Sequence, residues 1–373
     1  MEQTKTTPQP APTQRLLSLD ALRGFDMFWI VGAGSIVEAL RAANSRAWVR
    51  FLATQLDHRA WEGFTCLDLV FPLFVFIVGV SIVFSLDKII SREGRAAAYK
   101  RVATRGVLLF LLGVFYYGGL SKGLDGLRLL GVLQRIALCY LFTGLLFCAL
   151  KPKALAAVAV GLLIVYWALL TFVPVPGVGA GNFAEGMNLT NYLDKMYLPF
   201  WKWDGDHDPE GLLSTLPAIA SCISGVFAGF LLRSQKLAPQ KKVHWLLACG
   251  AAAAALGWLW GLQFPVIKKI WTSSYVLVAG GYSCLLLAAF YQMVDIWGWR
   301  RWTEPFVWIG SNPIAIYLTW DIVDFPKLAS RVVGGPIQGL FGAYGNLVVT
   351  AAGLGLTFLF VRTLYKKQLF LRI

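Results

Sequence analysis

Two of the three histidines in the chain lie in polar segments among acidic residues. His58 precedes Asp68 by ten residues, and His207 stands next to Asp208. An imidazole has an ordinary pKa of about 6.5, so it exchanges a proton near neutral pH, and a nearby carboxylate orients it and stabilises its charge. A loop histidine is commonly just solvated, but two such histidines in two long polar segments predict a site for proton transfer where the segments meet.

Charged side chains inside apolar stretches need a partner or a function, because a charge near the middle of a membrane span costs at least about 2.5–3.5 kcal/mol. In SLDALRGFDMFW, Arg23 follows Asp20 by three residues, so the two can pair at a helix end. Arg23 then either fixes the depth of the helix or helps to hold an anionic cosubstrate. In GVLQRIALCYLF, Arg135 follows Gln134 and must face the bundle interior or a wet cavity. Its planar guanidinium suits a phosphate or a polarised carbonyl.

The stretch EPFVWIGSNPIAIYLTW contains a Gly-Ser-Asn-Pro sequence that is expected to break a helix. Such a break leaves backbone groups unpaired unless a cavity or a partner meets them. Asn312 is expected either to bond a neighbouring helix or to contact a ligand, and Ser311 and Tyr317 lie beside it. Trp61, in a polar segment, either anchors the chain at the membrane interface or offers an aromatic face to a sugar ring.

The composition decides which elements position these residues. Of the 373 residues, 57% are hydrophobic and 14% are charged, and the mean hydropathy is +0.61. A soluble domain carries about 25% charged residues, so a soluble, disordered or secreted disulfide-rich protein is excluded. The six cysteines lie in apolar stretches without a metal-type spacing, so we expect no metal site.

The hydropathy pattern predicts an all-α, polytopic transmembrane bundle of about ten helices. The expected spans are 19–40, 64–86, 104–120, 128–150, 154–173, 211–232, 244–263, 272–293, 304–320 and 341–362. Residues 1–18 are expected to form a polar cytoplasmic tail, and residues 19–373 a single transmembrane domain. No internal repeat of the transporter type is evident.

The distribution of basic residues predicts the orientation. Most of the 34 Lys and Arg residues fall on the side of the N-terminus if the spans alternate, with the link 87–105 the most one-sided. By the positive-inside rule, both termini are cytoplasmic. Two long segments, 41–63 and 174–210, then lie outside, and they hold His58 and His207.

Six motifs along the chain resemble one family. They are RLLSLDALRGFDMFW, DHRAWEGFTCLDLVFPLFVFIVGVSI, GVLQRIALCY, HDPEGLLSTLPAI, KKIWTSSYVLVAGGYS and GSNPIAIYLTW. With these motifs in this order, the sequence resembles the heparan-α-glucosaminide N-acetyltransferase family, and more closely its bacterial NagX-like members. The second and fourth motifs are the most specific.

The resemblance implies acetyl transfer from cytoplasmic acetyl-CoA to the amine of a glucosamine on the far side of a bacterial inner membrane. Its active-site histidine matches His58 and its neighbouring carboxylate matches Asp68, which would fix the imidazole tautomer. His58 is expected to act as general base or as a transient acetyl carrier. Lysosomal members carry an asparagine near the outer end of the first helix, where this chain has Gly34. The expected partners are the amino sugar and the bilayer, with a homodimer also considered.

The remaining site residues divide into two sets. Those expected to bind acetyl-CoA are Arg23, Arg105, Gln134, Arg135 and Asn312. Those expected to bind the amino sugar are Trp61, Glu62, His207, Asp208, Glu210 and Tyr317, with Ser311, Asn312 and Tyr317 lining a tunnel between the two sides.

Two other functions fit the same pattern. An amino-sugar transporter would also place Asp and Arg side chains in its core, although it does not need a histidine-bearing loop. An O-acetyltransferase of a cell-surface glycan would share the donor and the topology and differ only in the acceptor.

Overall fold

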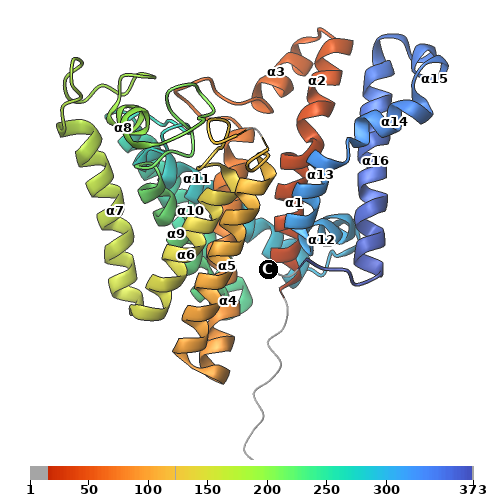
Figure 1. The fold of residues 1–373 in the computed structure, drawn as a ribbon. Coiled ribbons are helices and arrows are strands. Elements are labelled where there is room, and N and C mark those ends of the chain that lie inside the picture. The colour runs from red at the N-terminus through yellow and green to blue at the C-terminus, as the bar shows by residue number, and fades with distance from the viewer. Residues whose placement is uncertain (1–15, 122, 372–373) are drawn as a thin grey trace, which may run out of the picture.

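The computed structural model of the chain describes residues 16–121 and 123–371, so most of the predicted tail 1–18 lies outside the described residues. Within them the chain runs back and forth through a helical bundle (Figure 1). The crossings are α1 (Leu17–Phe28) with η1 (Trp29–Ala33) and α2 (Gly34–Ala43), α4 (Val70–Glu93), α5 (Arg95–Tyr116), α6 (Val132–Ala149), α7 (Pro152–Phe172), α9 (Thr215–Arg233), α10 (Pro239–Gly261), α11 (Ser273–Phe290) with η3 (Tyr291–Ile296), α12 (Glu304–Gly310) with α13 (Pro313–Ile322), and α16 (Gly345–Lys366).

Seven of the described helices are long and apolar enough to cross a membrane on their length and composition alone. The first crossing is divided by the π-helical turn η1, and the ninth is divided between α12 and α13. Among the described residues, all regular structure is helical. The predicted fold class, a polytopic helical membrane protein, is confirmed.

The third crossing begins earlier than predicted. The apolar stretch begins near residue 104, but α5 begins at Arg95, directly after Gly94 ends α4 with a φ of +86°. The intervening RAAAYKRVA is rich in good helix formers, so the helix continues beyond its apolar part. Hydropathy therefore locates the buried part of this helix and misses its polar first turns.

The predicted break at Gly-Ser-Asn-Pro is present. Helix α12 ends at Gly310, and Pro313 occupies the first turn of α13, where its missing N–H costs nothing. The Asn312 side chain bonds the segment after α16, because its amide nitrogen donates to Leu369 O (2.9 Å) and its oxygen accepts from Leu371 N–H (3.1 Å). These bonds are intramolecular, and the ligand contact expected of Asn312 stays a prediction.

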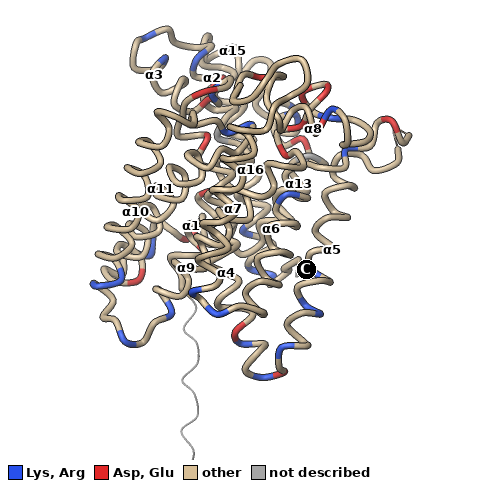
Figure 2. The backbone as a smooth tube through the Cα atoms, turned by 90° about the vertical axis from the view of Figure 1, so that its left-hand side faces the viewer, with Lys and Arg blue, Asp and Glu red and all other residues tan. Residues whose placement is uncertain are grey.

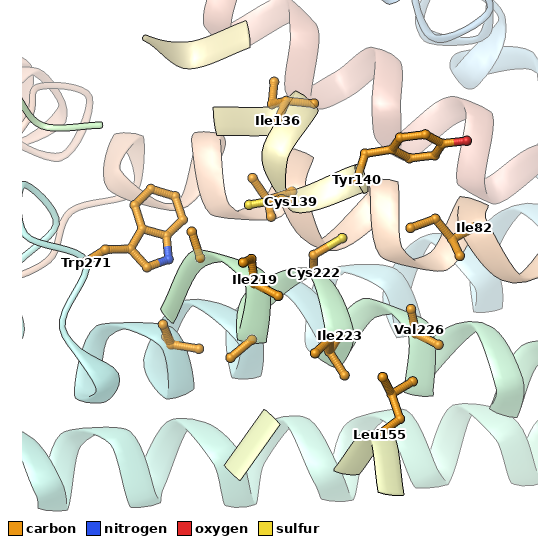
Figure 3. Packing of buried hydrophobic residues seen from close by; sticks show 14 of the residues in the cluster. Ile82, Ile136, Cys139, Tyr140, Leu155, Ile219, Cys222, Ile223, Val226 and Trp271 are labelled. Carbon is orange, nitrogen blue, oxygen red and sulfur yellow. The ribbon is translucent and has the colours of Figure 1, made fainter. Parts of the chain in front are cut away.

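Helices α4, α6 and α9 form the centre of the bundle. Gly79 of α4 and Gly225 of α9 let these two backbones approach so closely that an added Cβ would clash with a carbonyl of the partner helix. Figure 3 shows the buried side chains of this core, including Cys139 and Cys222, and all six cysteines are free.

The two ends of the bundle differ. One end, which we call the loop face, holds the links that follow α2, α5, α7, α10 and α13, and the short helices in three of these links lie at the top of Figure 1. Those short helices are α3 (Ala47–Gln55), α8 (Leu189–Tyr197), α14 (Phe325–Val333) and α15 (Pro336–Leu340). Both long polar segments therefore reach the same end. In Figure 2 acidic residues gather near α8 at this end, while Lys and Arg mark the turns at the opposite end.

Candidate active site

Asp68 is the fixed point of the loop-face site. It lies in the short helix η2 (Leu67–Leu69) that leads into α4, and it is fully buried. Its Oδ2 accepts from the backbone N–H of Thr65 (3.1 Å), the hydroxyl of Thr65 (3.0 Å) and the backbone N–H of Arg59 (3.3 Å). The Tyr275 hydroxyl donates to the backbone carbonyl of Asp68 (2.8 Å). These bonds leave Oδ1 free to bind another group.

His58 binds that oxygen. Its Nδ1 lies 2.9 Å from Asp68 Oδ1, and about half of the His58 side chain (52%) is exposed. With the proton placed on Nδ1 and donated to the carboxylate, Nε2 keeps its lone pair and is able to accept a proton. The loop thus folds back onto the start of α4, which is the condition that a contact between these two residues requires. The catalytic role of the pair stays a prediction.

A third residue of this cluster was missed from the sequence. Lys268 Nζ lies 2.8 Å from His58 Nδ1, 3.3 Å from His58 Nε2 and 3.3 Å from Asp68 Oδ1. An isolated antiparallel bridge between Glu62 and Ile267 brings the two segments together although they lie far apart in the sequence. The available signal was weak: a Lys-Lys pair directly before an apolar span.

His58 and Lys268 border a cavity of about 870 Å³ at the loop face. We call it the loop-face cavity. Its lining includes Gly34, His58, Arg59, Tyr116, Tyr117, Arg128, Trp203, Asp204, Glu210, Lys268, Lys269, Trp271 and Tyr317. An added Cβ at Gly34 would meet open space.

Arg128 engages two of the predicted sugar ligands. Its guanidinium binds Asp208 through two bonds of 2.9 and 2.7 Å and Glu210 through one of 2.7 Å. The ring of Tyr117 stacks on it, with the guanidinium carbon 4.5 Å from the ring centre, and Trp203 lies on it at 4.9 Å. Burial, and then the neighbouring Asp208 carboxylate, raise the pKa of Glu210. Both carboxylate oxygens of Asp208 accept from Arg128, and Asp208 lies outside the cavity lining. Glu210 is part of that lining.

Three other predicted sugar ligands lie outside the lining of the loop-face cavity. Trp61 donates from Nε1 to Phe183 O (2.9 Å) and packs among loop residues. Glu62 is exposed at the bridge to Ile267. His207 is buried, with Nδ1 2.8 Å from Asp206 Oδ1. The structure therefore does not bring His207 together with His58 in one cluster.

His207 also belongs to a group with metal-like geometry. Its Nε2 faces carboxylate oxygens of Glu185 (3.8 Å) and Asp204 (3.9 Å). The ammonium of Lys269 already lies between these carboxylates, 2.7 Å from Glu185 and 3.1 Å from Asp204. Lys269 therefore supplies the positive charge that a metal ion would bring.

A second cavity of about 320 Å³ lies towards the other end of the bundle, and we call it the opposite cavity. Its lining includes Arg23, Phe74, Ser81, Ser85, Arg101, Arg105, Tyr140, Ser311, Tyr317 and Leu371. Arg23 donates to Ser81 Oγ (2.7 Å) and pairs with Asp20 (3.3 Å). Arg105 lies over the ring of Tyr140, and its Nε has no hydrogen-bond partner among the described residues. Arg101, one helical turn before Arg105, was not predicted to line this cavity.

The other predicted acetyl-CoA ligands lie elsewhere. Arg135 is buried between α6 and the start of α9, where it donates to Gly211 O (3.1 Å) and Ser214 Oγ (2.5 Å). Gln134 is buried and donates to Arg128 O (3.3 Å). Neither side chain is part of the lining of either cavity.

The two cavities meet inside the bundle. Four residues line both of them, namely Ile30, Phe71, Val132 and Tyr317. The Tyr317 ring stacks on Tyr116 with 4.5 Å between the ring centres. The predicted place of Tyr317 between the two sides agrees with this lining.

The fold and the cavities define the class of the molecule: a polytopic helical membrane protein with a polar site at one end and an arginine-lined cavity towards the other. The model of a family described as a domain of unknown function (DUF5009) matches residues 15–188.

Two curated proteins are similar in sequence to most of the chain. The chain is 28% identical to the human heparan-alpha-glucosaminide N-acetyltransferase over 369 aligned positions, which cover 83% of this chain and 53% of that protein. It is 27% identical to the mouse protein of that name, with 85% and 56% covered. The chain is homologous to these enzymes, and it spans about half the length of the curated relatives that it matches.

Proposed function

We propose that the chain is a membrane acetyltransferase that moves an acetyl group from acetyl-CoA to the amine of glucosamine or a terminal glucosaminide. The observation that carries this proposal is that His58, which bonds the buried Asp68, lines a cavity that meets an arginine-lined cavity inside the bundle. The names of the homologous enzymes support the reaction.

The reaction needs a neutral amine, a base and stabilisation of the tetrahedral oxyanion. The amine nitrogen attacks the thioester carbonyl carbon, and the carbonyl electron pair moves to oxygen. His58 Nε2 takes the proton that the amine loses. The tetrahedral intermediate then collapses, the C–S bond breaks, and the CoA thiolate leaves. In the alternative order His58 itself carries the acetyl group before the amine attacks.

The opposite cavity suits the donor. Arg23, Arg101 and Arg105 offer guanidinium groups to the phosphates of CoA. A bilayer core is about 30 Å thick, and extended CoA is on the order of 20 Å long (from chain geometry). A nucleotide held at that end therefore presents its thioester near the partition between the cavities.

The charge bias supports the orientation in which the loop face lies outside the cytoplasm. The end of α4, the start of α5 and the end of α16 carry Lys and Arg at the opposite end of the bundle. For a bacterial inner membrane, this orientation places the sugar site in the periplasm and the CoA site in the cytoplasm.

The test uses purified full-length protein in detergent with acetyl-CoA and glucosamine. We expect free CoA and N-acetylglucosamine in equal amounts, and a loss of about 10²–10⁴-fold in kcat for His58→Ala. His244→Ala, an exposed histidine at the opposite end, is the matched control.

Three outcomes contradict the proposal. Equal rates for His58→Ala and the unaltered protein remove the proposed base. Uptake of radiolabelled glucosamine into proteoliposomes without CoA release indicates a transporter. Equal acetylation of glucose, which has hydroxyls and no amine, indicates an O-acetyltransferase.

A further inference from the structure

Lys268 lies on a segment whose backbone is held in place on both sides. Gly63 N–H donates to Val266 O (2.9 Å), and Ile267 N–H donates to Thr272 Oγ1 (3.1 Å). The Lys268 side chain is about 20% exposed and ends in the loop-face cavity. The backbone therefore brings this ammonium to the site in a defined position.

The contacts of Lys268 go beyond a simple ion pair with Asp68. Its Nζ lies within 3.3 Å of both imidazole nitrogens of His58. The in-plane directions at the two nitrogens diverge, so one ammonium cannot bond both along them at once. Nζ is closer to Nδ1 (2.8 Å) than to Nε2 (3.3 Å), and an N–H directed away from the Nδ1 proton is within reach of the space next to Nε2, the nitrogen left to accept a proton. An incoming amine and carbonyl must approach this same place.

The charges around Lys268 come from several elements. The carboxylates of Asp68 and Glu210 attract the ammonium of Lys268, and His58 contacts it. Burial has the largest influence on the pKa of Lys268. Arg59, Arg128, Asp204 and Lys269 line the same cavity. Burial lowers the pKa of Lys268 from its ordinary value, and the carboxylate of Asp68 partly opposes that effect.

We propose that Lys268 is a third functional residue of the site, whose ammonium donates a hydrogen bond to the thioester oxygen as that oxygen becomes an oxyanion. This inference rests on the acetyl-transfer function proposed above. Before substrate binds, the ammonium neutralises Asp68 beside His58. When nitrogen attacks and the electron pair moves to oxygen, an N–H of Lys268 stabilises the new charge without giving up its proton. When the C–S bond breaks, the carbonyl re-forms and the hydrogen bond weakens.

The first test compares Lys268→Met with Lys195→Met. Lys195 also lies at the loop face and pairs with a carboxylate, at 3.2 Å from Asp206, and it lies outside the cavity lining. We expect Lys268→Met to lower kcat by about 10²–10³-fold, the effect of removing one oxyanion donor. The KM for acetyl-CoA should stay within about twofold, since CoA binds at the other end. Lys195→Met should retain the unaltered kcat.

The second test uses Lys268→Arg and a pH profile. Arginine stays protonated at all working pH values, so this variant should regain part of the lost kcat. The unaltered enzyme should lose activity at high pH as the ammonium deprotonates, and in Lys268→Arg this basic limb should move to higher pH. A role limited to structure predicts no such movement.

The outcomes separate the two proposals. If the unaltered protein releases no CoA, the acetyl-transfer function fails. If the unaltered protein is active and His58→Ala is inactive, but Lys268→Met keeps its kcat per folded molecule, the Lys268 inference is overturned. Thermal unfolding of each variant measures the folded fraction, and Lys268→Gln replaces Lys268→Met if the latter does not fold.

Discussion

The two cavities differ in how their charges are paired. In the loop-face cavity, Lys268, Lys269 and Arg128 each contact a carboxylate. The opposite cavity is lined by three arginines and, among the described lining residues, by no carboxylate. Matched charges in a partly buried site hold groups in place for proton transfer. Arg23 pairs with Asp20, which lies outside that lining, whereas Arg101 and Arg105 pair with no carboxylate among the described residues, and such cations attract an anion. This difference supports the proposed division of roles, with the chemistry at the loop face and the binding of a polyanionic donor at the other end.

The largest effect should follow from removing the charge that orients His58. In Asp68→Asn the amide NH2 competes for the imidazole and favours the tautomer with its proton on Nε2, so the base is lost. We expect kcat to fall by about 10²–10⁴-fold with little change in the KM for acetyl-CoA. Steady-state kinetics on both substrates measures this. A rise in the KM for acetyl-CoA with an unchanged kcat would contradict the assignment of the chemistry to the loop-face cavity.

A second large effect should follow from removing Arg128. The change Arg128→Met leaves Asp208 and Glu210 buried without their cation, and breaking a buried pair in this way costs about 3–5 kcal/mol. Thermal unfolding in detergent should show a clearly lower midpoint. The triple variant Arg128→Met, Asp208→Asn, Glu210→Gln removes the unpaired charges and should recover much of the loss. If Arg128→Met unfolds at the same temperature as the unaltered protein, the ion pairs of Arg128 with Asp208 and Glu210 do not stabilise the fold.

At the opposite cavity the expected effect is on binding. Arg101→Gln and Arg105→Gln should each raise the KM for acetyl-CoA about tenfold, since a hydrogen bond to a charged group contributes about 1.5–3 kcal/mol, and kcat should hold. The increase should shrink as ionic strength rises, because salt screens exposed charges. Arg92→Gln, exposed at the same end and outside the lining, is the control. A fall in kcat with an unchanged KM would place the chemistry at this end.

The smallest effect concerns stability and pH at the loop face. Burial raises the pKa of Asp194 in α8 to about 6, above the ordinary value of about 3.9. Between about pH 4 and 6 the folded state therefore binds more protons than the unfolded state, and this group stabilises the protein as pH falls. Asp194→Asn should remove that contribution, so its unfolding midpoint should rise less than that of the unaltered protein between pH 7 and 5. An identical pH dependence would contradict this assignment.

The sequence predicted the parts of the molecule that depend on local pattern. Apolar runs indicated a polytopic helical bundle, in which seven described helices are long and apolar enough to cross a membrane, and the break before Pro313 was visible in four consecutive residues. The His58–Asp68 contact was also predictable, because ten residues of loop can fold back onto the helix that they precede.

Contacts between distant segments could not be read in this way. Lys268 lies 210 residues from His58, and no local pattern records the bridge that joins their segments. Arg128 lies 80 residues from Asp208 and 82 residues from Glu210, so no local pattern predicted their pairing. Arg135 was correctly predicted to avoid lipid, but hydropathy cannot distinguish a cavity wall from a packed helix interface.

The partition formed by Ile30, Phe71, Val132 and Tyr317 has an electrical consequence. If water fills both cavities, the membrane voltage falls mainly across these few side chains, and moving one elementary charge through them involves about 2.3 kcal/mol per 100 mV. An acetyl group carries no charge, while CoA carries several. The rate of acetyl passage should therefore be nearly independent of membrane voltage, and the nucleotide should stay in the compartment from which it came.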